Sequence, residues 1–281
     1  DQSIQNTQDV HHFLRAPVLA SIPSPNSLNG RRNENALHAE QVSALNLTGQ
    51  EPVVSDAQVV GATQSDSGVH KNPVLSEAFR ELRTSVLFSG SGRPGNSILV
   101  TSAQSKEGKT TIAMNLAISL AQLGRPVLLI DADMRRPCVQ KYFPQKGSRL
   151  SSYLAGQGTW REMVYQSSVS GLCVLLCGPL PSNPTELLSS DTMRALIRET
   201  SAEYSYVVFD SPPLLDVADS RILASIVGAT VLVVKSGDTP RHVVQYAISQ
   251  ARSAGTNLLG VVLNNIDVRS NDYSYLAHGR S

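Results

Sequence analysis

The chain has 281 residues and a formal net charge of +1 at pH 7. This length predicts one large domain or two small ones, and a charge so close to zero gives no general reason to expect nucleic acid as a partner. Apolar residues make up 41% of the sequence, enough for a sizeable core, and no run of about 18 of them predicts a membrane-spanning helix.

Residues 1–71 are predicted to be a flexible linker segment, because they are rich in Ser, Asn, Gln and Pro and show little sustained periodicity. Within this region, residues 9–23 carry the pattern of a short helix followed by an extended segment. His11 and His12 have no third ligand nearby, and we interpret them as a surface pair. The sequence begins with Asp1 rather than Met, so we expect a fragment of a longer protein.

Order is expected to begin near residue 72. Ser76 is suited to cap a helix whose inward positions are Phe79, Leu82 and Val86. The opposite face of this helix carries three charged residues spaced by three, which project together: Glu77, Arg80 and Arg83. Spacing alone predicts a solvated charged face here.

From residue 97 onward, strand and helix patterns alternate. Apolar runs predict strands at 98–101, 127–130, 172–176, 206–209, 230–234 and 258–263. Helical patterns lie between most of them, at 109–123, 184–202 and 240–253. Continuous apolar strands that alternate with helices predict an α/β fold with a mostly parallel sheet flanked by helices on both faces.

The segment 97–116 has the order strand, polar loop, helix. Its loop matches the pattern G-x-x-x-x-G-K-[ST], except that Ala103 replaces the first Gly, so we interpret it as a deviant Walker A loop of a P-loop NTPase. Backbone N–H groups at the helix start would bind phosphate, Lys109 would reach the β- and γ-phosphates, and the Thr110 hydroxyl would hold Mg²⁺. The expected nucleotide-binding residues of the loop are Ala103, Gln104, Ser105, Lys106, Glu107, Gly108, Lys109, Thr110 and Thr111.

Acidic residues follow two of the predicted strands. Ligands of parallel sheets bind at the carboxyl ends of strands, where Asp131 and Asp133 follow one strand and Asp210 follows another. Buried acids need a cation, and Mg²⁺ supplies it. Asp210 is the predicted Walker B acid on the metal. Asp131 is expected to hold a metal-bound water or to accept a proton, and Asp133 is a second candidate for base or metal work.

Asn264 follows the last predicted strand, at the same edge of the sheet. Its amide is suited to read the edge of adenine, but Asn is also a good turn former, so both interpretations stay open.

Three segments together resemble the bacterial tyrosine kinases, which are P-loop kinases attached to exopolysaccharide chain-length regulators. These segments are SAQSKEGKTTIAMNLA, VLLIDADMRRP and YVVFDSPPLLDVADS. The helix at 77–83 is similar to the family's E-x-x-R-x-x-R oligomerisation helix, and NPTELL at 183–188 also matches. The resemblance implies a kinase domain at 72–270 and a tyrosine-containing tail at 271–281. PVLASIP looks like the segment after the second transmembrane helix of fused members, which implies the cytoplasmic portion of a larger membrane protein.

The resemblance implies a role for each site residue, with ATP and Mg²⁺ as the cofactors. Lys109 would stabilise the phosphate being transferred. Thr110 and Asp210 would hold Mg²⁺, with Asp131 close to the metal and acting as the base, and Asp133 would assist.

The resemblance also implies partners. Glu77, Arg80 and Arg83 would join neighbouring protomers into a ring, and each protomer would phosphorylate its neighbour's tail at Tyr273 and Tyr275. A transmembrane chain-length regulator, fused or separate, and a protein-tyrosine phosphatase complete the expected set at the cytoplasmic face of the bacterial inner membrane.

Departures from the family pattern keep alternatives open. Ser105-Lys106 stands where members often have Pro-Gly, and the Lys106 side chain would either crowd the loop or add positive charge for phosphate. The tail has two tyrosines, which is a short cluster or a truncated one. One alternative is a partitioning-type ATPase, but its signature lysine is replaced here by Gln104. The other is a nucleotide-binding assembly module of a polysaccharide export complex without kinase activity.

Overall fold

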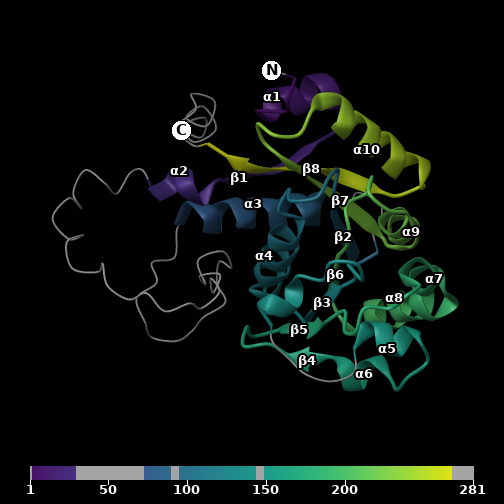
Figure 1. Ribbon diagram of the computed structural model, residues 1–281. Coiled ribbons are helices and arrows are strands. Elements are labelled where there is room, and N and C mark those ends of the chain that lie inside the picture. The colour runs from purple at the N-terminus through teal and green to yellow at the C-terminus, as the bar shows by residue number, and fades with distance from the viewer. Residues whose placement is uncertain (1, 30–72, 90–94, 144–148, 268–281) are drawn as a thin grey trace, which may run out of the picture.

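The computed structural model describes residues 2–29, 73–89, 95–143 and 149–267 (Figure 1). Within them, one sheet has the strand order β1-β8-β7-β2-β6-β3-β5-β4. Neighbouring strands are parallel except for β4, which runs antiparallel to β5. The strands are β1 (Val18–Pro23), β2 (Ser97–Ser102), β3 (Val127–Asp131), β4 (Tyr165–Gln166), β5 (Leu172–Leu175), β6 (Tyr206–Asp210), β7 (Ala229–Lys235) and β8 (Leu258–Ile266).

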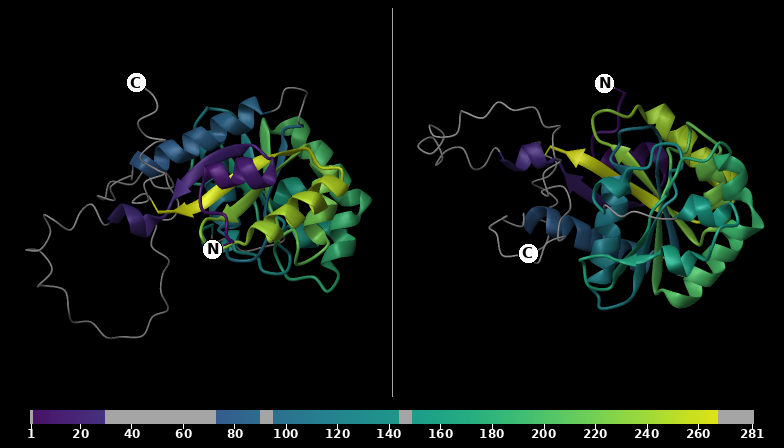
Figure 2. Two further views of the ribbon diagram at one scale, coloured as in Figure 1. Left: turned by 90° about the horizontal axis from the view of Figure 1, so that it is seen from above. Right: turned by 60° about the horizontal axis from the view of Figure 1, so that its bottom comes forward.

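Helices cover both faces of this sheet (Figure 2). One face is covered by α3 and α4, and the other by α8, α9, α10 and the smaller helices near them. The α-helices are α1 (Thr7–Asp9), α2 (Pro25–Asn29), α3 (Pro73–Phe88), α4 (Lys109–Ala121), α5 (Leu150–Leu154), α6 (Trp160–Met163), α7 (Pro184–Ser189), α8 (Asp191–Glu203), α9 (Asp219–Ile226) and α10 (Arg241–Ser253). A π-helical turn (Val10–Leu14) and a 3₁₀ turn (Val139–Lys141) complete them.

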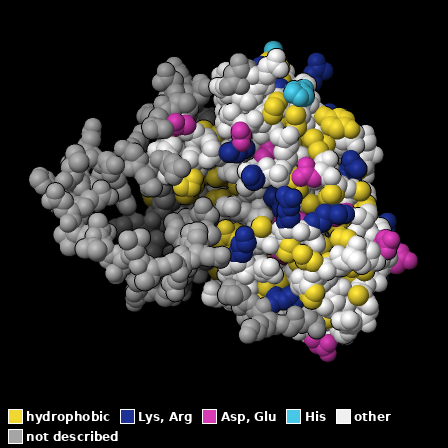
Figure 3. Space-filling model, in the orientation of Figure 1, with side chains coloured by type: hydrophobic (Ala, Val, Ile, Leu, Met, Phe, Trp, Pro, Cys, Tyr) yellow, Lys and Arg dark blue, Asp and Glu magenta, His cyan; other side chains and the backbone are white. Residues whose placement is uncertain are grey.

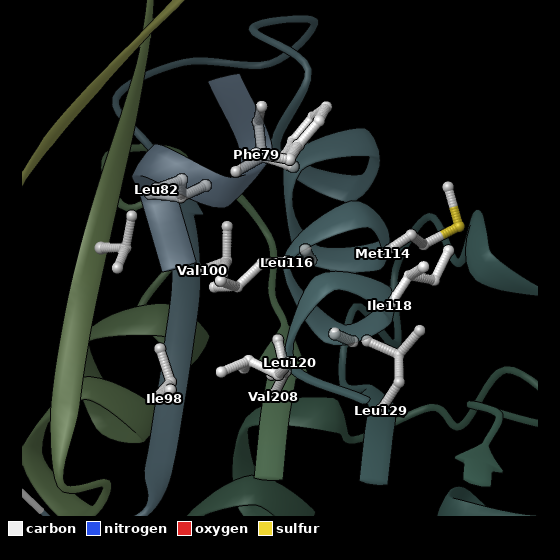
Figure 4. Packing of buried hydrophobic residues seen from close by; sticks show 14 of the residues in the cluster. Phe79, Leu82, Ile98, Val100, Met114, Leu116, Ile118, Leu120, Leu129 and Val208 are labelled. Atoms are coloured by element: carbon white, nitrogen blue, oxygen red, sulfur yellow. The ribbon is translucent and has the colours of Figure 1, made fainter. Parts of the chain in front are cut away.

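The strands are apolar throughout because both faces of the sheet are covered. In β2, Ile98 and Val100 pack toward α3 and α4, whereas Leu99 packs into the cluster on the opposite face. Leu82 of α3 and Leu116 of α4 belong to the first of these clusters (Figure 4). This alternation with period two is what a twisted strand between two helix layers requires.

Helix α4 carries the phosphate loop at its start and is the most deeply buried helix. Every residue from Ile112 to Ala121 is buried. A helix that is apolar on most sides must be enclosed, and α4 packs against β2, β3 and β6 of the sheet and against α3 beside it. The start of α4 is therefore held rigidly at the carboxyl edge of the central strands.

The α/β fold, the parallel sheet and all six predicted strands are confirmed. The expected helix 184–202 is two helices, because Ser190 adopts an extended conformation and its hydroxyl caps α8 by accepting the Met193 N–H. Helix α3 begins at Pro73, so Ser76 lies inside it and is not its cap. Helices α5, α6 and α9 and strand β4 were not predicted.

The N-terminal residues differ from the predicted linker. Strand β1 pairs in parallel with β8 at the edge of the sheet, with Ile22 opposite Asn264. Ile4, Val10 and Leu14 are buried in the cluster that α10 covers. The ordered unit therefore begins well before residue 72, because the short apolar run of β1 is stabilised by a partner strand from the other end of the chain. Residues 30–72 and the tail with Tyr273 and Tyr275 lie outside the described residues. In the part of the chain that is described, no helix has the length and apolar character needed to cross a bilayer.

Candidate nucleotide and phosphoryl-transfer site

The phosphate loop connects β2 to α4 at the carboxyl edge of the sheet. Gly108 caps α4 in the left-handed conformation, with φ of 89°, and Lys106 also has a positive φ of 67°. The N–H groups of the first helical turn lack intrahelical partners, and the helix dipole places partial positive charge there. Lys and Arg side chains gather near the middle of the face drawn in Figure 3, between the positions of α4 and α9. This edge of the sheet is suited to bind phosphate groups.

The buried side chain of Glu107 stabilises this loop through hydrogen bonds. Its Oε2 accepts the Gln104 N–H at 2.7 Å, and its Oε1 accepts the Thr239 hydroxyl and the Lys235 N–H, the latter at 3.4 Å. Burial raises the pKa of Glu107, and these hydrogen bonds oppose that rise. The Glu107 side chain is thus engaged inside the protein, where it fastens the loop to the connection between β7 and α10. Nothing in the spacing of the sequence indicated this role.

Asn264 braces the loop from β8. Its Nδ2 atom donates to the carbonyl oxygen of Glu107 at 2.8 Å. The structure therefore gives Asn264 a contact with the loop that was not anticipated, and its contact with adenine stays a prediction.

Gly108→Ala is expected to impair nucleotide binding. A Cβ atom at Gly108 would lie 2.2 Å from Nδ2 of Asn264, and its φ of 89° strains any residue with a side chain. We expect the strain to cost about 1–2 kcal/mol of unfolding free energy, and displacement of Asn264 to weaken ADP affinity, measured by calorimetric titration. Gly124→Ala is the matched control, since Gly124 has φ of 73° but open space around it. Equal ADP affinity in the two variants would contradict the prediction.

The structure brings Lys109, Thr110 and three predicted acids together. Lys109 Nζ lies 3.0 Å from Asp133 Oδ2 and 3.4 Å from Asp210 Oδ1. The Thr110 hydroxyl donates to Asp210 Oδ2 at 2.7 Å. Asp131 stands opposite Asp210 in the β3–β6 pairing, and its Oδ2 accepts the Val139 N–H at 3.2 Å. The fold thus places the strand-end acids beside the start of α4, as the carboxyl-edge rule predicts.

Negative charges outnumber positive charges in this buried cluster. Burial lowers the pKa of Lys109, but attraction to Asp210, Asp133 and Asp131 outweighs this and raises it overall. Burial, reinforced by repulsion from Asp210 and Asp133, holds the pKa of Asp131 well above its usual range. Burial also raises the pKa of Asp210, although Lys109 and Thr110 oppose this. Three carboxylates therefore share one lysine.

Of the three residues expected at a protomer interface, two are exposed and the third contacts α4 of the same protomer. Glu77 and Arg80 form an exposed ion pair at 2.8 Å on α3. Arg83 instead turns to α4, where its Nη1 donates to the carbonyl oxygen of Ser119 at 2.8 Å. The expectation that all three project together is therefore wrong for Arg83, because α4 packs beside α3.

Three residues next to the site had been quoted only as parts of matching segments, without a role: Arg135, Thr185 and Asp219. Arg135 forms an ion pair with the buried Asp219 at 2.8 Å, and Thr185 joins them. The sequence indicated a role for Arg135 only through its basic side chain two positions after Asp133.

A parallel sheet whose carboxyl edge presents a phosphate loop, a lysine, a threonine and strand-end acids defines a P-loop nucleotide-binding domain. The family model described as an AAA domain matches residues 96–238, and the chain belongs to that family. Within this class, the chain belongs to the bacterial tyrosine-protein kinases, which confirms the resemblance read from its motifs.

Comparisons with two related sequences and with one solved structure support this assignment. The chain is 40% identical over 202 residues to tyrosine-protein kinase YwqD of Bacillus subtilis, covering 71% of this chain and 85% of that protein. It is 36% identical over 208 residues to tyrosine-protein kinase Etk of Escherichia coli, covering 73% of this chain but 29% of Etk. The solved kinase domain of Etk superposes with a TM-score of 0.78 at 28% identity, over 95% of this chain and 97% of that one.

Proposed function

We propose that the protein is an ATP- and Mg²⁺-dependent tyrosine autokinase. It phosphorylates C-terminal tyrosines of neighbouring protomers and thereby regulates exopolysaccharide polymerisation or export at the cytoplasmic face of the inner membrane. The observation that carries this proposal is the convergence of Lys109, Thr110, Asp133 and Asp210 beside a phosphate loop in a member of the tyrosine-protein kinases. As its partner we propose a transmembrane chain-length regulator, fused N-terminally; the match to only 29% of Etk supports a longer protein of this kind. A protein-tyrosine phosphatase would remove the phosphoryl groups by hydrolysis.

The residues present fit a magnesium ion. Asp131 Oδ1 is buried and has no hydrogen-bond partner within the described part of the chain, and the excess of carboxylates over lysine calls for added positive charge. No three His, Cys, Asp or Glu side chains of the described residues form a ready metal site. This agrees with the P-loop arrangement, in which a hydroxyl, one acid and phosphate oxygens share the ion. Thr110 and Asp210 would hold it, with Asp131 beside them. When bound, Mg²⁺ neutralises charge on the β- and γ-phosphate oxygens.

The remaining roles belong to side chains of the protein. Lys109 stabilises negative charge on the γ-phosphoryl group during transfer. Asp131 accepts the proton of the attacking tyrosyl hydroxyl, since it ends β3 at the edge of the sheet that carries the phosphate loop, opposite Asp210. Asp133 assists by holding Lys109 at 3.0 Å.

Incubation with ATP and Mg²⁺ tests the proposal. The wild-type chain is expected to become positive for phosphotyrosine, and the Tyr273→Phe/Tyr275→Phe double variant is expected to lose most of that signal. Mass mapping identifies the labelled residues, and label found only elsewhere would reject the tail as acceptor. Release of phosphate without phosphotyrosine would favour a partitioning-type ATPase. Binding of ATP and ring formation without either product would favour an assembly module.

Arg80→Glu is expected to weaken the ring. It places like charges at Arg80 and Glu77 on the exposed side of α3, and exposed pairs contribute only about 0.2–1 kcal/mol to folding. We therefore expect a lower oligomer mass in light scattering with almost unchanged thermal stability. Arg198→Glu, on the exposed side of α8, is the control. An unchanged oligomer mass in Arg80→Glu would exclude this face as the interface.

A further inference from the structure

A buried carboxylate outside the catalytic set anchors the loop after β3. Arg135 donates to Asp219 through Nε at 2.8 Å and through Nη2 at 3.2 Å. The Thr185 hydroxyl donates to the same carboxylate at 2.7 Å. The Asp219 side chain is fully buried, whereas that of Arg135 is 41% exposed. A two-point contact between a guanidinium and a buried carboxylate fixes orientation as well as distance.

The main chain of Arg135 holds Asp133. Asp133 Oδ1 accepts the N–H of Arg135 at 3.3 Å and that of Arg136 at 2.9 Å, while its Oδ2 contacts Lys109. Arg135 therefore binds Asp133 through its backbone N–H and binds α9 through its side chain. Any shift of α9 would move the carboxylate that holds Lys109.

The next residue of α9 contacts the other strand end. Ser220, also fully buried, donates to the carbonyl oxygen of Pro212, and its Oγ lies 3.2 Å from that of Ser211. Ser211 directly follows Asp210, the last residue of β6. Consecutive residues in the first turn of α9 thus contact the segments that carry both acids.

We infer that the first turn of α9 sets the position of Asp133 relative to Asp210, with Arg135, Asp219 and Ser220 as positioning residues. This rests on the proposed kinase function, since those two acids belong to its site. The β3–β6 ladder ends with the Ala132 N–H, which donates to the carbonyl oxygen of Asp210 at 2.8 Å, and Asp133 lies one residue beyond that bond. Misplacement of a reacting group by about 1 Å can cost about 10²-fold in rate.

Arg135→Lys tests the inference. Lysine keeps a positive charge opposite Asp219 but replaces the two-point contact with a single one. We expect kcat for tyrosine phosphorylation to fall about tenfold while the Kd for Mg²⁺–ADP changes less than about twofold. Amide hydrogen exchange across residues 132–139 is expected to rise. Arg161→Lys is the control, because Arg161 also pairs with acids, Glu199 and Glu203, but on α6 and α8.

Two further variants sharpen the test. Asp219→Asn combined with Arg135→Lys is expected to lose less kcat than the losses of the two single variants multiplied together, because both changes weaken the same contact. Ser220→Ala leaves the ion pair intact and is expected to raise amide exchange at Ser211 and Leu214, the two residues of the segment 211–214 that carry a backbone N–H.

The outcomes are separable. Unchanged kcat and unchanged exchange in Arg135→Lys would overturn the inference, as would equal losses of kcat and ADP affinity, which indicate general damage. A wild-type chain that forms no phosphotyrosine would refute the kinase function, and the exchange measurements would still decide whether α9 supports the two strand ends.

Discussion

Lys109→Met is expected to reduce the rate of phosphotyrosine formation by about 10²–10³-fold. Methionine keeps the apolar stem but removes the ammonium group that contacts both Asp133 and Asp210. The charge that develops on the transferring phosphoryl group would then have no lysine to stabilise it. The rate is measured by quantitative anti-phosphotyrosine blotting at saturating ATP.

The same substitution should also destabilise the fold. Removing one partner of a buried ion pair costs about 3–5 kcal/mol, because the carboxylates remain buried without compensation. Rates are therefore normalised to the folded fraction, measured by circular dichroism. Lys235→Met is the control, since the Lys235 side chain pairs with Asp238 near the surface at 2.8 Å. If Lys109→Met retains activity, the assignment of this site is wrong.

Asp131→Asn is expected to stabilise the nucleotide-free protein and to abolish its activity. Asn can still accept the Val139 N–H, but it removes a buried negative charge that lies beside two others. Relief of this desolvation and repulsion should raise the unfolding free energy by about 1–2 kcal/mol, measured by urea denaturation with EDTA present. A protein less stable than wild type would show that the Asp131 charge is compensated in a way the structure does not display.

The stability gain should depend on pH. The pKa of Asp131 is raised in the folded state, so over the interval between the unfolded and folded pKa values the folded state binds more protons than the unfolded state. Wild-type stability therefore loses a contribution as pH rises from about 4 toward the folded pKa. The advantage of Asp131→Asn should be absent near pH 4 and larger at pH 8. A constant difference across this range would contradict the raised pKa.

The central sheet could be predicted because its strands are unbroken apolar runs, as strands covered on both faces must be. The run ending at Ile130 and the run ending at Phe209 are of this kind. Strand β1 could not be assigned in the same way, because Val18–Pro23 is flanked by prolines and depends on pairing with β8 from the opposite end of the chain. Helix α9 is a single short amphipathic segment, too brief for a periodic signal.

The acids of the site were predictable from topology, because strand ends of a parallel sheet meet at one edge. Their supports were not. The contact between Asn264 and Glu107 joins residues far apart in sequence, and no spacing rule indicates it. Arg83 illustrates the same limit, since the helical pattern that placed it on a charged face carries no information about α4 packing beside it.

Because β1 covers the edge of the sheet, a truncated domain that lacks β1 would expose β8. Strand β8 has nine residues and is largely apolar, and β1 satisfies its outer row of backbone N–H and C=O groups. A polypeptide that started at residue 72 would leave that row open, and an open apolar edge is a template for strands of other molecules. Such a shortened domain would be prone to strand exchange and precipitation even with every residue that contacts the nucleotide in place.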